Sequence, residues 1–294
     1  MTAKKIYILV INPISGDLDK TEISEKTIAF ANDLAIEIIV YETTGTNDES
    51  EINKLFLAIK PERIIIAGGD GTIKMVGEAL EKEDIIFGII PAGSANGLAI
   101  DLNLPTTLEE SIKVAFQKDF IEIDMVEINN KKSLHLSDIG LNALLIKNYE
   151  NGTMRGKLGY ALKVLPTLSE SEVPFKAVIE FDDKTIECVS QMIVIANSQK
   201  YGTGVTINPN GLINDGKFEI IVIKTLDLFT IGKIITGNMT DDSEEIDTYC
   251  TSKATITTSR KVSFQSDGEY YGEENKLDIT ILPNHMKIAV SNKI

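Results

Sequence analysis

The chain has 294 residues, of which 43% are hydrophobic and 25% are charged. This composition is ordinary for a globular protein large enough to form two domains, and no apolar run is long enough to cross a membrane as a helix. The formal net charge of -15 argues against a nucleic-acid partner, because binding to a phosphate backbone requires clustered lysine and arginine side chains. The first apolar run, Ile6–Ile11, is too short for a signal peptide, so we expect a cytoplasmic protein.

Residues 1–130 alternate short apolar runs with amphipathic patterns, which predicts an α/β domain with a parallel sheet wound by helices. The runs are almost uniformly apolar, as expected where helices cover both faces of a sheet. The expected strands are Ile6–Ile11, Ile36–Val40, Arg63–Ala67, Ile85–Ile90 and Ile121–Ile128. The expected helices are Thr21–Asp33, Asp48–Lys60 and Ile73–Leu80.

Residues 131–283 have a different texture, with short strands separated by Asp, Asn and Gly turns, which predicts an antiparallel β-sandwich domain. We also consider a return of residues 284–294 to the first domain. The expected strands are Lys176–Phe181, Thr185–Val189, Met192–Asn197, Phe218–Ile223, Ala254–Thr258, Lys261–Gln265 and Leu277–Leu282. Two helices are expected at Leu158–Leu168 and Leu226–Thr236, and a surface loop at Thr240–Asp247.

Three polar loops follow apolar runs of the first domain. They are Asn12–Gly16 (NPISG), Gly68–Thr72 (GGDGT) and Pro91–Asn96 (PAGSAN). Because each loop follows a strand, we expect all three at the carboxyl edge of the sheet, where open α/β sheets bind their ligands.

The GGDGT loop has the composition of a phosphate-binding loop. Its three glycines allow backbone N–H groups to approach phosphate oxygens, and the helix that follows adds a favourable dipole. Asp70 would repel a phosphate unless a cation lay between them, which indicates a bound Mg²⁺. The alternative is an ordinary turn in which Asp70 caps the helix.

The PAGSAN loop repeats this design after the next strand. Gly93 and Ser94 offer N–H and hydroxyl donors, and Asn96 offers a side-chain amide. A proline-glycine turn in which Ser94 caps a helix is the alternative.

In the second domain, Ser266–Glu269 (SDGE) places two carboxylates beside a glycine. A hairpin turn alone would explain this sequence. An enzyme that transfers a phosphoryl group to a hydroxyl needs a carboxylate that orients or deprotonates this hydroxyl, and Asp267 or Glu269 could supply it. The segment Asn208–Gly216 is also rich in turn residues, and its Asp215 suits a cap or a cation ligand.

These loops, in this order, resemble the diacylglycerol kinase catalytic family, which includes bacterial soluble lipid kinases and the related sphingosine and ceramide kinases. The resemblance extends over nearly the whole chain, from NPISG through the strand that ends in Asp124, NDGKFEI from Asn214, and SDGE. NAD kinases share GGDGT, whereas its combination with NPISG and PAGSAN is specific to the lipid kinases.

The resemblance implies an N-terminal α/β nucleotide-binding domain like that of phosphofructokinase and NAD kinase, a C-terminal antiparallel β-sandwich, and an active site in the cleft between them. It implies that Asp70 holds a catalytic Mg²⁺ with support from Asp124, and that Glu269, with Asp267 beside it, is the general base. The implied ATP contacts are Asn12, Thr43, Gly68, Gly69, Asp70, Gly71, Thr72 and Ser94. A structural Mg²⁺ would bind the backbone oxygens of Leu212 and Lys217 and the carboxylate of Asp215.

The expected activity is transfer of the γ-phosphoryl group of Mg-ATP to a hydroxyl of a membrane lipid, with diacylglycerol as the first candidate. Gly97 stands where bacterial diacylglycerol kinases usually carry Asp, so a sphingoid base or ceramide is a rival acceptor. An NAD kinase and a catalytically silent lipid- or nucleotide-binding protein are the remaining alternatives. We expect transient, peripheral contact with the inner face of the membrane, no nucleic-acid partner, and consider a homodimer.

Overall fold

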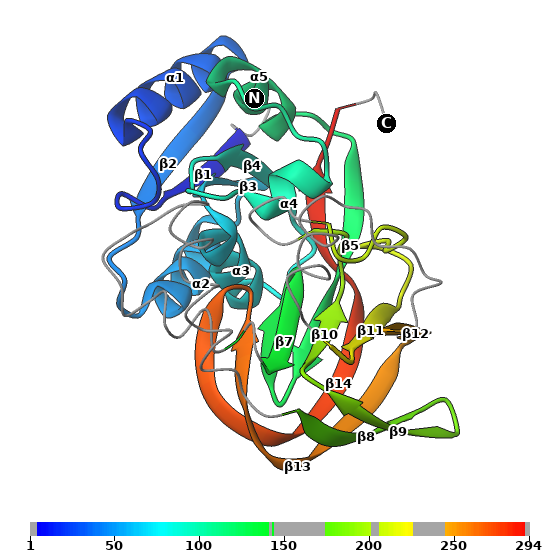
Figure 1. The fold of residues 1–294 in the computed structure, drawn as a ribbon. Helices are drawn as coiled ribbons and strands as arrows, with labels where there is room; N and C mark the ends of the chain where they lie inside the picture. The colour runs from blue at the N-terminus through cyan, green and yellow to red at the C-terminus, as the bar shows by residue number, and fades with distance from the viewer. Residues whose placement is uncertain (1–4, 141–142, 144–173, 201–205, 226–244, 292–294) are drawn as a thin grey trace. The chain divides into compact units, whose positions relative to one another are not determined.

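The computed structural model describes residues 5–140, 143, 174–200, 206–225 and 245–291 (Figure 1). The chain divides into two compact units. The first contains Met1–Ile123 and Asn284–Ile294, and the second contains Asp124–Pro283. The long strand β14 (Glu269–Ala289) therefore contributes residues to both units.

Parallel strands form the sheet of the first unit, in the order β2, β1, β3, β4 and β14. Every residue of β3 is buried, because helices cover both of its faces. Four of the predicted strands are confirmed with small shifts at their ends. They are β1 (Lys5–Ile11), β2 (Ile36–Glu42), β3 (Arg63–Gly68) and β4 (Ile86–Pro91).

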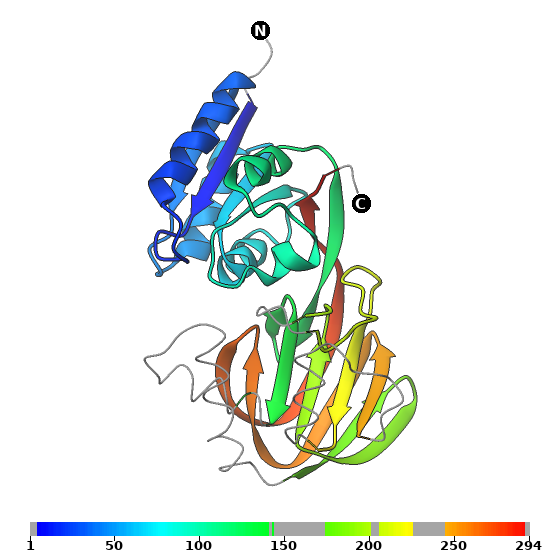
Figure 2. The ribbon, with the colours of Figure 1, turned by 45° about the horizontal axis from the view of Figure 1, so that its top comes forward.

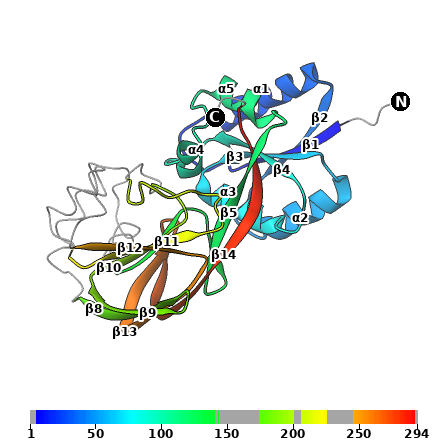
Figure 3. The same cartoon turned by 90° about the vertical axis from the view of Figure 1, so that its right-hand side faces the viewer.

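Helices lie on both faces of this sheet (Figure 3). α1 and α5 contact each other on one face, and α2 and α3 contact each other on the other. α4 and α5 were not predicted, since such short helices show too few turns to give a clear apolar period. The helices are α1 (Lys20–Asp33), α2 (Asp48–Ile59), α3 (Asp70–Ala79), α4 (Gly97–Asp101) and α5 (Leu108–Ala115).

One predicted strand pairs differently from the prediction. The run Ile121–Ile128 was assigned to the parallel sheet, but β5 (Phe120–Ile128) pairs with β6 (Lys131–Ser133) and β14. The antiparallel pairing with β6 was not predicted, because an apolar run indicates burial and does not specify the neighbouring strand or its direction.

Antiparallel strands form the second unit (Figure 2). Neighbouring strands follow the order β12, β11, β10, β7, β13 and β14, while β8 pairs with β13 and β9. The strands are β7 (Leu136–Gly140), β8 (Phe175–Phe181), β9 (Lys184–Ser190), β10 (Met192–Ala196), β11 (Phe218–Ile223), β12 (Ile246–Thr251), β13 (Lys253–Ser266) and β14.

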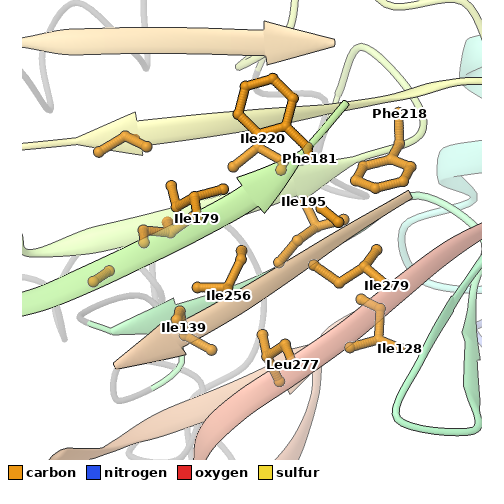
Figure 4. Close-up of a cluster of buried hydrophobic side chains, with 14 of the residues drawn as sticks. Ile128, Ile139, Ile179, Phe181, Ile195, Phe218, Ile220, Ile256, Leu277 and Ile279 are labelled. Atoms are coloured by element: carbon orange, nitrogen blue, oxygen red, sulfur yellow. The ribbon is translucent and has the colours of Figure 1, made fainter. Parts of the chain in front are cut away.

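β13 replaces the two separate strands predicted at Ala254–Thr258 and Lys261–Gln265. Its pairing register with β14 shifts between Thr257 and Val262, an irregularity that bends a strand without ending it. The early part of β13 pairs with β8 and the late part with β7. Figure 4 shows part of the apolar core that these strands enclose, including the buried ring of Phe218. Phe175 and Phe264 also contribute buried rings to this core.

Other predictions for the second half have mixed outcomes. The predicted helices Leu158–Leu168 and Leu226–Thr236 lie outside the described residues. The surface loop predicted at Thr240–Asp247 is wrong at its end, because β12 starts at Ile246. The first five residues of the predicted loop lie outside the described residues. Within the described ranges, no helix combines the length and apolar character needed to cross a membrane.

We predict that Gly88→Ala destabilises the first unit. A Cβ atom at this position of β4 would lie 2.8 Å from the Cβ and 2.9 Å from the Cα of Ala115 in α5. Such overpacking costs about 1–3 kcal/mol. Urea denaturation would measure the change in the free energy of unfolding.

Gly71→Ala is the matched control, because no atom lies within 4 Å of the corresponding Cβ position at the start of α3. The control should retain wild-type stability. Equal stability of the Gly88→Ala variant would contradict the assigned packing of α5 on β4.

Candidate functional site

The three glycine-containing loops of the first unit lie together at the carboxyl ends of β1, β3 and β4. Asn12, which follows β1, donates a hydrogen bond from Nδ2 to Oγ1 of Thr72 at 3.0 Å. Ser15 donates from its hydroxyl to the carbonyl oxygen of Ala92 at 3.1 Å. NPISG therefore contacts both GGDGT and PAGSAN, and the predicted convergence of the three loops is present in the structure.

GGDGT and PAGSAN meet through glycine backbones. A Cβ atom placed on Gly93 would clash with the Cα of Gly69 and lie 3.0 Å from its nitrogen. A side chain at this contact would force the two loops apart. The glycines are thus required for the approach of the two loops, in addition to any role in admitting a phosphate.

The carboxylate of Asp70 joins GGDGT to α4. Oδ2 accepts a hydrogen bond from the N–H of Gly97 at 2.7 Å, and Oδ1 accepts one from the N–H of Leu98 at 3.0 Å. The alternative, in which Asp70 caps its own helix, does not match the structure, because the N-cap of α3 is Gly69. Carboxylate oxygens are the hard donors that Mg²⁺ prefers, so this arrangement fits a cation bound directly or through water.

The start of α3 has room for an anion. Gly71 is exposed, and no atom lies within 4 Å of the position that a Cβ would take there. The first N–H groups of a helix have no acceptor within the helix, and the helix dipole favours a negative charge at this end. Gly68, Gly69 and Thr72 complete this loop, so its residues fit the phosphates of a nucleotide.

Lys20 is a basic residue beside these loops that the sequence interpretation missed. Its Nζ donates to the carbonyl oxygens of Leu18 at 2.8 Å and Ala92 at 3.5 Å. Burial lowers the pKa of Lys20, against the opposing effect of Asp17 and Asp19. Only its position as the first residue of the helix after NPISG could have indicated this location.

The side-chain amide of Asn96 forms hydrogen bonds within the PAGSAN loop. Oδ1 of Asn96 accepts from the N–H of Gly93 at 2.8 Å, and Nδ2 donates to the carbonyl oxygen of Gly93 at 3.0 Å. Asn96 therefore closes the loop, whereas Ser94 is exposed. Of the donors named from the sequence, Ser94 is the one with an exposed side chain.

Thr43 lies at the end of β2, where its N–H donates to the carbonyl oxygen of Ile11 at 2.8 Å. The loop after it is held by the buried carboxylate of Asp48, which accepts from the N–H groups of Thr44 at 2.9 Å and Gly45 at 2.7 Å. The Tyr41 hydroxyl donates to the same carboxylate at 2.7 Å. Asp48 therefore fixes the loop that follows Thr43.

The SDGE segment forms the tight turn between β13 and β14, with Ser266 paired to Glu269. Asp267 and Gly268 both have positive φ, at 50° and 86°, which suits a two-residue hairpin turn. The two carboxylates of this turn have different surroundings. Asp267 accepts from the hydroxyl of Ser133 at 3.1 Å and from the N–H groups of Leu134 and His135 at 2.8 and 2.9 Å.

Glu269, in contrast, has an exposed side chain. Its Oε2 accepts a hydrogen bond from the hydroxyl of Tyr271 at 2.8 Å. Asp267 thus anchors the turn to the segment before β7, while Glu269 presents a carboxylate to solvent.

Asp124 and the predicted structural metal site lie together in the second unit. Asp124 is buried, its N–H donates to the carbonyl oxygen of Ile213 at 2.8 Å, and its Oδ2 accepts from the N–H of Gly216 at 2.7 Å. These bonds hold the turn that contains the three predicted ligands, Leu212, Asp215 and Lys217. Oδ1 of Asp215 accepts from the N–H of Lys217 at 3.0 Å.

A metal in this turn would depend on backbone oxygens. No cluster of three His, Cys, Asp or Glu side chains suited to a metal occurs in the part of the chain that the structure describes. The carboxylate and carbonyl donors of the turn are the hard oxygens that Mg²⁺ prefers. The structural Mg²⁺ remains a prediction, as does support of the Asp70 metal by Asp124.

Comparison with known proteins follows the same two-part division. Residues 6–128 match the diacylglycerol kinase catalytic domain, and residues 135–290 match the YegS C-terminal NAD kinase beta sandwich-like domain. The lipid kinase YegS of Escherichia coli (strain K12) is 29% identical over 226 residues, which cover 75% of each protein. A diacylglycerol kinase of Bacillus subtilis (strain 168) is 27% identical over 282 residues, 90% of this chain and 89% of the relative.

A solved structure has a similar fold over nearly the whole chain. The crystal structure of a diacylglycerol kinase from Bacillus anthracis str. Sterne matches 99% of this chain and 98% of its own, with a TM-score of 0.76 and 20% identity. The predicted fold class, an α/β nucleotide-binding domain followed by a β-sandwich domain, is confirmed.

We predict that Asp48→Asn lowers the free energy of unfolding at pH 7 by about 1–3 kcal/mol. Burial disfavours the charge of Asp48, but the hydrogen bonds from Thr44, Tyr41 and Gly45 outweigh it and lower the pKa of this carboxyl. The stabilisation is therefore full above the ordinary pKa of about 3.9 and is lost as the pH falls through the lower folded-state pKa. Urea denaturation at pH 7 and pH 3 would measure it.

Glu49→Gln, at the exposed neighbouring position, is the control and should change stability little at either pH. The difference between the wild type and Asp48→Asn should be smaller at pH 3 than at pH 7. An equal difference at both values would show that the charge of Asp48 does not hold the loop.

Proposed function

We propose a function from family membership: the chain belongs to the diacylglycerol kinase family, in the group with a YegS C-terminal domain, and it transfers the γ-phosphoryl group of Mg-ATP to a hydroxyl of a membrane lipid. The observation that carries the proposal is the junction of NPISG, GGDGT and PAGSAN at one edge of a parallel sheet. Catalysis of phosphoryl transfer consists mainly of positioning and charge stabilisation, and this junction offers both.

ATP is the proposed donor. Its phosphates would lie against the N–H groups of Gly69 and Gly71, with the Thr72 hydroxyl and its partner Asn12 nearby and the exposed Ser94 in PAGSAN. Thr43 is proposed as a further ATP contact. A bound Mg²⁺ would neutralise phosphate charge and orient the transferred group. The carboxylate of Asp70 would hold it, because the bonds from Gly97 and Leu98 fix both carboxylate oxygens in place.

Glu269 is the proposed general base. In the reaction, the lipid oxygen bonds to the γ-phosphorus, the bond between that phosphorus and the β,γ-bridging oxygen breaks, and ADP leaves. The hydroxyl proton passes to the Glu269 carboxylate. Asp267 is less suited to this role, since three donors already bind its carboxylate and tie it to Ser133, Leu134 and His135.

Diacylglycerol is the proposed acceptor, in keeping with the name of the Bacillus subtilis relative, a diacylglycerol kinase. A sphingoid base or ceramide is the second candidate acceptor, because Gly97 stands where bacterial diacylglycerol kinases usually carry an aspartate. We propose that contact with the membrane is transient and peripheral, at its inner face. Two rival functions remain. One is an NAD kinase, an enzyme with a soluble acceptor, and the other is a catalytically silent lipid- or nucleotide-binding protein.

We predict that the protein consumes ATP in the presence of Mg²⁺ only when a suitable lipid is supplied. The assay would use mixed micelles of diacylglycerol, sphingosine, ceramide or monoacylglycerol, with NAD as a soluble control. Formation of phosphatidic acid from diacylglycerol is the expected result, since binding energy from the acyl chains positions the hydroxyl.

Phosphorylation of sphingosine or ceramide instead would keep the reaction class and replace the acceptor. Activity on NAD alone would overturn the lipid kinase proposal. Tight binding of ATP without turnover on any acceptor would favour the silent binding protein.

A second prediction concerns Asp70. Asp70→Asn should lower kcat by about 100-fold or more, because an amide lacks the negative charge that holds the metal. Asn can still accept one of the two bonds from Gly97 and Leu98, so the melting temperature should change by only a few degrees. Steady-state kinetics and thermal unfolding would measure the two effects.

Asp33→Asn is the control, because it removes an exposed carboxylate at the end of α1. The control should keep wild-type kcat. Near-normal turnover by Asp70→Asn would show that the catalytic metal lies elsewhere.

A further inference from the structure

Tyr271 lies two residues after Glu269 on β14, so both side chains project from the same face of the strand. Its ring packs against the apolar core, with the ring centroid 6.1 Å from that of buried Phe264. The hydroxyl at the other end donates to Oε2 of Glu269 at 2.8 Å. A core-anchored ring therefore holds one oxygen of an otherwise exposed carboxylate.

Lys131, the first residue of β6, binds the face of this ring. Its Nζ lies 3.6 Å from the ring centroid of Tyr271, within the range of a cation–π interaction. The ammonium fixes the ring and withdraws electron density from it, which makes the hydroxyl a stronger donor. The contact thereby supports the bond to Glu269.

The segment that follows Lys131 binds the other carboxylate of the same turn. Ser133, Leu134 and His135 donate to Asp267, and the N–H of Asp267 donates to the carbonyl oxygen of Leu136 at 3.0 Å. Residues 131–136 thus stabilise the turn through two sets of contacts. They fix its backbone through Asp267 and reach the side chain of Glu269 through Tyr271.

We propose that Tyr271 and Lys131 are positioning residues that orient the Glu269 carboxylate for proton abstraction. This inference rests on the proposed function, in which Glu269 is the general base. Glutamate has several rotatable bonds, and an exposed glutamate samples many rotamers. The bond to Oε2 restricts them and leaves Oε1 to receive the proton from the lipid hydroxyl, which lowers the entropic part of the barrier.

The decisive variant is Tyr271→Phe, which retains the ring and its packing on Phe264 and removes only the hydroxyl. We expect kcat with diacylglycerol micelles to fall about tenfold, as for the loss of one hydrogen bond to a charged group. The KM for ATP and the melting temperature should stay at wild-type values. Tyr270→Phe, at the adjacent position on the opposite strand face, is the matched control and should retain kcat.

A pair of substitutions tests Lys131. Lys131→Arg keeps a cation over the ring and should retain kcat within about twofold. Lys131→Met keeps most of the stem and removes the charge, and it should lower kcat about threefold. In the Tyr271→Phe background, Lys131→Met should have no further effect, since its influence passes through the missing hydroxyl.

The outcomes separate this inference from the proposed function. Loss of activity in Glu269→Gln together with unchanged kcat in Tyr271→Phe would overturn the positioning role alone. Parallel losses of kcat, ATP affinity and melting temperature in Tyr271→Phe would reduce Tyr271 to a structural residue and also overturn it. Full activity of Glu269→Gln, or a wild-type protein inactive on every lipid, would remove the proposed base or kinase and the inference with it.

Discussion

The geometry of the proposed phosphate site depends on the two hydrogen bonds that the Asp70 carboxylate accepts from Gly97 and Leu98. They connect the helix that starts in GGDGT to the helix that follows PAGSAN, two segments that follow neighbouring parallel strands. The contact between Gly69 and Gly93 brings these segments close enough for the bonds to form. The same bonds compensate part of the carboxylate charge and fix its direction, so a negative group can stand beside the proposed phosphate site.

Local sequence patterns were sufficient to predict most of the first unit. The apolar runs of β1, β2, β3 and β4 and the periods of α1 and α2 identify their elements, because helices on both faces of a parallel sheet bury the strands almost completely. The rule that open α/β sheets bind ligands at their carboxyl edge grouped NPISG, GGDGT and PAGSAN correctly, and the resemblance to the diacylglycerol kinase family is confirmed by the matches to both domains. Pairing partners were harder to predict, and the antiparallel pairing of β5 with β6 was missed because burial is local information and strand pairing is not.

Side-chain partners that are distant in the sequence could not be predicted. Asn96 reads as a free donor in PAGSAN, yet it bonds to Gly93 and closes its own loop. Asp124 bonds to the turn at Ile213 and Gly216, and no local pattern around Asp124 indicates these contacts. Lys20 has no motif at all, and its position beside Ala92 follows from the packing of α1. Each case depends on tertiary packing that brings together residues far apart in the chain.

The two carboxylates of the SDGE turn, Asp267 and Glu269, have different surroundings that suit different roles. Its hairpin geometry requires positive φ at Asp267 and Gly268, which directs the Asp267 carboxylate back onto the N–H groups of Leu134 and His135. The next residue starts β14 and so presents Glu269 outward, where a substrate hydroxyl could reach it. A carboxylate that accepts hydrogen bonds from several backbone N–H groups stabilises the turn. Fewer of its lone pairs are then left to accept a proton from the substrate. Burial and hydrogen bonding, which the sequence does not encode locally, therefore make Asp267 the anchor of the turn and leave Glu269 as the proposed base.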